Sequence, residues 1–349
     1  MSGLMRRSDA RAFAQIIPQL LLYVATATLA YLAFLEVHAS NWPWALPLLL
    51  LALFVHTTLS RFLFVAPVHE LVHKTPFRTQ ALNEVFLKIY SFLSWADYVA
   101  FRTSHVKHHQ STVHADEDGE LVLPQGLDWH GVRFIIARLT CSPIKIYRLF
   151  RNWVTAARGK VTVCDEWFSA DWLRRILPDS NTALRREHRN WARAVLIGHL
   201  ALATLFIVTG HWFLIIIVTF GCLCSNWFAV ICSYPQHVGM SPNVSDFRLC
   251  CRTYTCGWFP AFLYWNMQYH VEHHMFPAVP FYNLPKLRRA IEHDLPPAPH
   301  GLWATWKQII PIMERQREDK NYTFVPQLPG GDGERVTDRV LQSEAAQMA

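Results

Sequence analysis

The sequence predicts an all-α membrane protein, with four transmembrane helices arranged as two hairpins and a cytoplasmic helical cap that gathers histidines. Three observations predict this fold class. Of the 349 residues, 52% are hydrophobic and only 17% are charged, whereas charged residues make up about a quarter of an average soluble domain. The chain also contains four long apolar runs and three short histidine clusters.

The apolar runs define the expected spans. A helix that crosses a membrane needs about 20 predominantly apolar residues. The third run is short for a span and needs help from its flanks, whereas the other three are long enough by themselves. The expected spans are residues 16–37, 44–65, 194–209 and 212–232.

The connections between these runs predict the orientation. The tight turns at 38–43 and 209–212 contain no Lys or Arg, whereas the stretch 74–193 carries 18 of the 33 basic residues. Basic residues accumulate on the cytoplasmic side of membrane proteins. We therefore expect both termini and the histidine clusters to be cytoplasmic, and both tight turns to lie outside.

Charge and cysteine content exclude other classes. The net charge of +7 is expected to reflect topology and attraction to anionic lipid. The basic residues are dispersed through Trp-rich apolar sequence, so no nucleic-acid partner is predicted. The eight cysteines lack the spacing of a disulfide or zinc framework and are expected to be reduced thiols.

Residues 1–314 are expected to form one membrane domain, and residues 315–349 a polar, mobile tail.

The histidine clusters indicate a metal site. HELVH (69–73), HVKHH (105–109) and HVEHH (270–274) hold eight of the 18 histidines. Ligands at i and i+4 project from one face of a helix, and imidazole binds iron, zinc, copper and nickel. Eight imidazoles exceed the needs of one tetrahedral zinc. The cap is therefore predicted to hold a histidine-rich site for two metals.

The clusters and their flanks also identify a family. HHQSTVHADEDGE (108–120) and NMQYHVEHHMFPAVPFYNLPKL (266–287) continue the second and third clusters. With HELVH, they resemble the three histidine boxes of the integral-membrane fatty acid desaturases and related hydroxylases. The order, the spacing and the position of the boxes relative to the hydrophobic hairpins match as well, and the resemblance covers about residues 15–295.

The resemblance implies an O2-dependent membrane enzyme with two iron ions. By position, the implied metal ligands are His69, His73, His105, His108, His109, His270, His273 and His274. The family often has one more histidine between the second and third boxes, and His237 is the candidate. Glu70, Asp116, Asp118, Glu120 and Glu272 are near enough in sequence to hold the second ring nitrogens. Purified protein is expected to carry zinc in some preparations, because zinc binds such nitrogen sites more tightly than Fe(II).

The resemblance also implies the partners. The default substrate is a fatty acyl chain in the lipid bilayer, which would be desaturated. Two aromatic stretches, 85–101 and 257–269, either guide the substrate from the bilayer or anchor the cap. The chain contains no fused cytochrome b5 motif, so electrons are expected from a separate donor of the ferredoxin, rubredoxin or cytochrome b5 type. The expected location is a bacterial inner membrane.

Three alternatives stay open at this level. The same ligands could serve a hydroxylase that acts on a lipid or a small molecule. HELVH also satisfies the HExxH pattern of a membrane zinc protease, with Glu70 as general base, although six clustered histidines would then have no role. A non-enzymatic metal carrier would instead place histidines inside the spans. The isolated His56 and His199 do lie on spans, but each is expected to form a helix–helix hydrogen bond.

Overall fold

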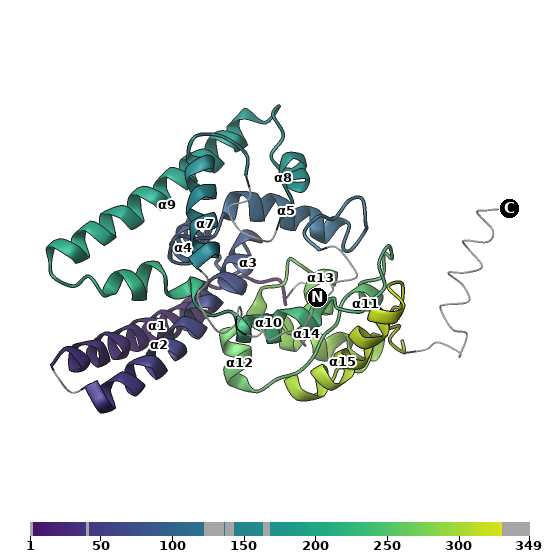
Figure 1. Cartoon of the computed structure of the whole chain (residues 1–349). Coiled ribbons are helices and arrows are strands. Elements are labelled where there is room, and N and C mark those ends of the chain that lie inside the picture. Colours follow the sequence, from purple (N-terminus) through teal and green to yellow (C-terminus); the bar gives the residue numbers. More distant parts are fainter. Residues whose placement is uncertain (1–2, 40–41, 122–135, 137–142, 163–167, 330–349) are drawn as a thin grey trace.

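The structure, a computed structural model, describes residues 3–39, 42–121, 136, 143–162 and 168–329. Apart from one isolated bridge between Thr255 and His300, the regular elements in these ranges are helices (Figure 1). The α-helices are α1 (Asp9–His38), α2 (Trp42–Val65), α3 (Pro67–Val72), α4 (Gln80–Leu93), α5 (Tyr98–Gln110), α7 (Pro143–Ala157), α8 (Ala170–Ile176), α9 (Thr182–Val208), α10 (Trp227–Ser233), α11 (Phe247–Cys250), α12 (Trp258–Leu263), α13 (His270–Met275), α14 (Leu284–Ile291) and α15 (Leu302–Glu318).

Three helical stretches are long and apolar enough to cross a membrane: Asp9–His38, Trp42–Val72 and Thr182–Val208. The first two form the long hairpin of α1 and α2, and the second continues through α3 into the cap (Figure 1). Large apolar side chains on their outer faces are exposed, among them Leu21, Leu50 and Leu200. Such exposure fits contact with lipid rather than water. The chain is therefore an integral membrane protein; the expected spans at 16–37 and 44–65 lie within these helices, and the expected span at 194–209 ends one residue beyond the third.

The expected fourth spanning helix at 212–232 is not formed as one helix. A π-helix at Ile215–Thr219 and a 3-10 turn at Gly221–Leu223 precede the short α10. The seven residues of α10 rise only about 10 Å, well short of a hydrocarbon core about 30 Å thick.

The break has a physical cause in contacts from α2 and from the turn that follows α4. His56 Nε2 lies 3.2 Å from the Ile217 carbonyl oxygen, and Trp95 Nε1 donates to the Thr219 carbonyl oxygen at 2.7 Å. Irregular backbone at membrane depth is tolerated where other protein groups satisfy it or where it lines a cavity. The apolar run at 212–232 predicted a spanning helix here, because hydropathy does not register these backbone contacts.

A buried polar contact joins the cap to the spans. Gln19, in the middle of α1, accepts hydrogen bonds through Oε1 from Trp265 Nε1 at 2.9 Å and from Tyr90 OH at 3.3 Å. All three side chains are buried. A buried side-chain oxygen without a hydrogen-bond donor would destabilise the fold. These hydrogen bonds therefore fix the position of the segment before α13 relative to α1.

The C-terminal helix α15 runs past the expected domain boundary at residue 314, and the described chain continues to residue 329. Phe324 N donates to the Gly239 carbonyl oxygen at 2.6 Å, so this segment packs against the cap. Residues 330–349, which contain most of the predicted mobile tail, lie outside the described residues.

Candidate metal centre

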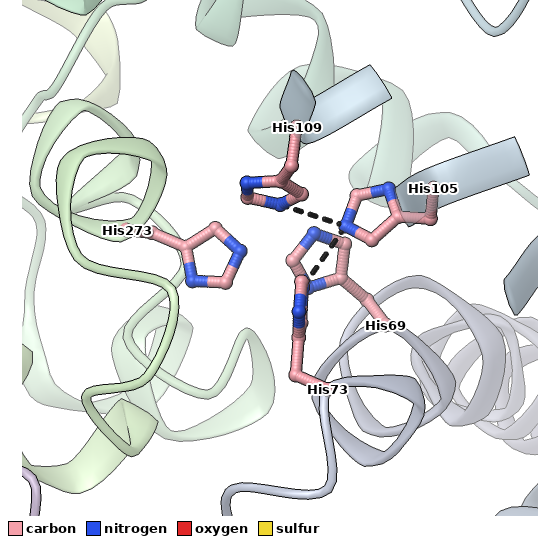
Figure 2. A group of neighbouring side chains, drawn as sticks. All are labelled: His69, His73, His105, His109 and His273. Carbon is pink, nitrogen blue, oxygen red and sulfur yellow. Dashed lines mark hydrogen bonds between the residues drawn. The ribbon is translucent and has the colours of Figure 1, made fainter. Parts of the chain in front are cut away.

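The clustered histidines and His237 meet in two adjacent groups. The first group is built from α3, α5 and α13, and its rings point toward one another (Figure 2). His105 Nε2 lies 3.1 Å from His73 Nε2 and 3.1 Å from His109 Nε2. One nitrogen from each member lies within 4.8 Å of the others, and the members are His69, His73, His105, His109 and His273.

The second group combines α5, α13 and the loop after α10. His270 Nε2 lies 2.7 Å from His237 Nε2 and 3.0 Å from His274 Nε2. All of its members are buried, and they are His108, His237, His270 and His274. The two groups touch where the rings of His109 and His274 stack with centroids 4.2 Å apart.

The outward ring nitrogens of four histidines have oxygen acceptors. His105 Nδ1 lies 2.9 Å from Glu120 Oε1, and His108 Nδ1 lies 2.7 Å from Asp118 Oδ2. His237 Nδ1 lies 3.0 Å from the Cys250 carbonyl oxygen. Because ionised carboxylates and carbonyls only accept, these Nδ1 atoms carry the proton. Their Nε2 lone pairs then face inward.

Thr112 supplies the fourth acceptor. Its hydroxyl donates to the His108 carbonyl oxygen at 2.6 Å, so its lone pairs face His274 Nδ1 at 3.1 Å. Neither Thr112 nor Cys250 was predicted from the sequence. Thr112 follows His108 by four residues, a spacing that could have been read as one helical turn. The Cys250 contact is a backbone contact and has no sequence signal.

The five predicted carboxylates divide in their roles. Glu120 and Asp118 contact ring nitrogens, as expected. Glu70 is buried, with Oε1 at 3.4 Å from His69 Nδ1 and 3.5 Å from His273 Nδ1. Glu272 is also buried, but it binds Thr253 Oγ1 and Arg288 Nη1 rather than a histidine, and so ties α13 to α14. For Asp116 the described contact is its carbonyl oxygen, which accepts from Arg175.

Burial keeps most of these rings neutral at pH 7. It lowers the pKa of His237 to about 3 and the pKa of His270 and His274 well below the ordinary value. Burial acts most strongly and against the charged form of His108 as well, but the hydrogen bond to Asp118 and the charges of Glu120 and Asp118 together outweigh it and raise the pKa of His108. Neutral imidazole is the form that binds metals.

The donor set fits metal ions. In the second group, His237 and His274 both direct an Nε2 lone pair at His270 Nε2, and a proton on that atom could serve only one of them. Facing lone pairs at such distances repel, and a cation among them converts the repulsion into ligation. An all-imidazole set suits iron, zinc, copper or nickel.

A buried arginine supports the His237 loop from behind. Arg252 Nη1 donates to the Pro235 carbonyl oxygen at 2.6 Å and to the Val238 carbonyl oxygen at 2.9 Å, on either side of His237. Among the described residues, Nε and Nη2 of this side chain have no hydrogen-bond partner. The Phe324 ring lies 5.8 Å from its guanidinium carbon. Burial lowers the pKa of Arg252 to about 10, so it remains charged. The sequence analysis missed this residue.

A cavity of about 860 Å³ adjoins both histidine groups. His69 and His105 of the first group and His237 of the second are part of its wall. The broken fourth segment supplies another part, and so do the two aromatic stretches predicted to lie at the interface. Described lining residues from these segments include Trp95, Phe101, Cys222, Leu223, Tyr264 and Met267.

The two isolated histidines lie on the spans and make hydrogen bonds between helices, as predicted. His56 Nδ1 lies 3.0 Å from Thr26 Oγ1 of α1. His199 Nε2 lies 3.0 Å from the Phe92 carbonyl oxygen of α4, and its ring stacks between Phe92 and Trp95. Neither belongs to a histidine group.

These features define an integral membrane protein with two histidine clusters that can bind metals, next to a cavity partly lined by the second span. The model of the family named "Fatty acid desaturase" matches residues 40–306. The chain belongs to this enzyme family, and the boxes recognised in the sequence lie within the match. No curated protein matches the chain.

Proposed function

We propose that the protein is a di-iron oxidoreductase that uses O2 and external electrons to desaturate a C–C bond, most simply in a fatty acyl chain. One observation carries this proposal: nine inward-facing imidazoles form two adjacent groups that open onto one cavity. Membership of the desaturase family supports a lipid substrate. A protease would use only two of these histidines, and its general base Glu70 is buried among them.

The metal ligands in this proposal are the members of the two groups. His69, His73, His105, His109 and His273 would hold one iron, and His108, His237, His270 and His274 the other. Bound there, the two irons would supply activation of O2 and removal of hydrogen from an unactivated C–H bond. Zinc fits the same nitrogen donors and could replace iron in purified protein.

The remaining side chains prepare the site. Glu120 and Asp118 hold protons at Nδ1 of His105 and His108, which fixes the tautomer and the ring orientation. Phe101 and Tyr264 give the cavity apolar walls that bind a hydrocarbon and exclude water. Precise placement of the reacting C–H bond decides the reaction.

Electrons would come from a separate carrier on the side of the cap. The basic residues of the stretch 74–193 and the positive-inside rule support a cytoplasmic cap. The carrier would be of the ferredoxin, rubredoxin or cytochrome b5 type, and the membrane the inner membrane of a bacterium.

Mass spectrometry of lipids from cells with and without the protein tests the reaction. Loss of two hydrogens from an acyl chain, dependent on His108, is the expected result. A gain of one oxygen would assign the chain to the hydroxylases of the family. Lipids and metabolites unchanged by the protein, in cells where it carries two irons, would contradict the proposed activity.

A further inference from the structure

One end of the cavity, beside α2 and the broken segment, carries polar side chains. Arg61 of α2, with Ser225 and Asn226 of the broken segment, lines this end. Ser225 Oγ lies 3.4 Å from Thr58 Oγ1, which places the break beside the turn of α2 that contains Arg61. We call these three lining residues the polar end.

The helix geometry places the polar end away from the histidines. Arg61, Val65 and His69 follow one another at intervals of four residues within the helical stretch Trp42–Val72, and all three line the cavity. They therefore share one stripe. Eight residues of helix separate the α-carbons of Arg61 and His69 by about 12 Å along the axis. That distance equals roughly ten bonds of an extended chain.

The polar end is unsuited to a hydrocarbon terminus. Asn226 Oδ1 is buried and has no hydrogen-bond partner among the described residues. Arg61 places a permanent positive charge in the same wall. Its guanidinium has five N–H donors, so it can hold a ligand oxygen alongside its other interactions.

We propose that the cavity binds a chain substrate with a second, hydroxyl-bearing end, whose O–H donates to Asn226 Oδ1 and whose oxygen accepts from Arg61. The oxidised C–H bond would then lie roughly ten bonds or fewer from that oxygen. The inference rests on the proposed oxidation at the histidine groups and makes the substrate more specific than a plain acyl chain. A plain chain would leave Asn226 Oδ1 facing methyl groups, which cannot donate a hydrogen bond to it.

Binding of three radiolabelled probes to the full-length protein in lipid nanodiscs tests this. The probes are 1-decanol, decanoate and decane, measured by equilibrium dialysis with protein-free nanodiscs subtracted. The expected result is at least about tenfold tighter binding of decanol than of decane, because a site built for a hydroxyl rejects the analogue that lacks it. Arg61→Met and Asn226→Leu should each reduce this preference below about threefold.

Two further variants sharpen the test. Asn226→Asp should keep decanol binding but weaken decanoate about tenfold, because two carboxylates repel. Arg193→Met on α9, which does not line the cavity, should leave all three affinities unchanged. Equal binding of the three probes by the wild type would overturn the proposal, and so would a full preference in Arg61→Met and Asn226→Leu.

The number of cobalt(II) ions bound per chain distinguishes a failure of the polar-end proposal from a failure of the proposed metal site. The polar-end variants should bind as much cobalt as the wild type, because neither residue belongs to a histidine group. A wild type that binds no metal but still prefers decanol would contradict the proposed function and leave the polar end intact.

Discussion

Replacement of His237 by alanine tests whether the loop after α10 supplies a ninth ligand. The change removes the Nε2 atom that lies 2.7 Å from His270 Nε2 and leaves three imidazoles in the second group. It also removes the Nδ1–H donor to the Cys250 carbonyl oxygen. The first group of five keeps all of its members.

The expected magnitude follows from these contacts. Loss of a residue that only supports a ligand lowers metal affinity by about 10–100-fold. Loss of a ligand should exceed that range and weaken the second metal by more than about 100-fold, or roughly 2.7 kcal/mol. The unpaired Cys250 carbonyl oxygen should lower stability by about 1–3 kcal/mol, which a protein with three apolar spans should survive.

Metal analysis of purified protein, loaded with excess Fe(II) and then dialysed, measures the effect. We expect about two irons per chain in the wild type and one in His237→Ala, with turnover lost. His199→Ala is a matched control, because it also removes a buried imidazole that contacts a backbone carbonyl oxygen, yet it should keep both irons. Two tightly bound irons and normal turnover in His237→Ala would refute ligation by this residue.

Three further predictions concern other parts of the molecule. Arg252→Gln should lower the affinity of the second metal by about 10–100-fold, because the carbonyl oxygens of the His237 loop lose their cationic donor. Metal titration of Arg252→Lys should show partial recovery of the affinity, which would distinguish a positioning role from misfolding. Chelation of the metals at pH 7 should lower the melting temperature, because inward-facing lone pairs then repel, and cobalt(II) should restore it; an unchanged melting curve would count against a metal-filled site. Thiol labelling in intact cells, with native cysteines removed, should reach a cysteine introduced at Ser40 but not one at Ser104, and the opposite pattern would invert the topology.

The location of the site could be predicted from local sequence patterns. His69 and His73 are separated by four residues, as are His105 and His109, so each pair shares one face of its helix once the segment is helical. Glu120 and Asp118 lie just beyond α5 and fold back onto it. These contacts depend on few residues between the partners, which is why spacing was informative.

The broken fourth segment could not be predicted in the same way. Hydropathy adds up the side-chain preferences for an apolar environment. It assumes that the backbone N–H and C=O groups of the segment form hydrogen bonds with one another. Here the acceptors are backbone carbonyls of Ile217 and Thr219, and their partners are His56 of α2 and Trp95 of the turn after α4. Arg252 was missed for a related reason, since it acts on backbone carbonyls far from any sequence motif.

The division into two groups has a simple origin in the paired histidines. Consecutive residues on a helix point about 100° apart, so two adjacent histidines cannot face the same point. His108 belongs to the second group and His109 to the first, while His273 belongs to the first and His274 to the second. Each HH pair therefore gives one ring to each group and fixes the groups side by side. The HELVH box has no such pair and serves only the first group, which leaves a place in the second for His237.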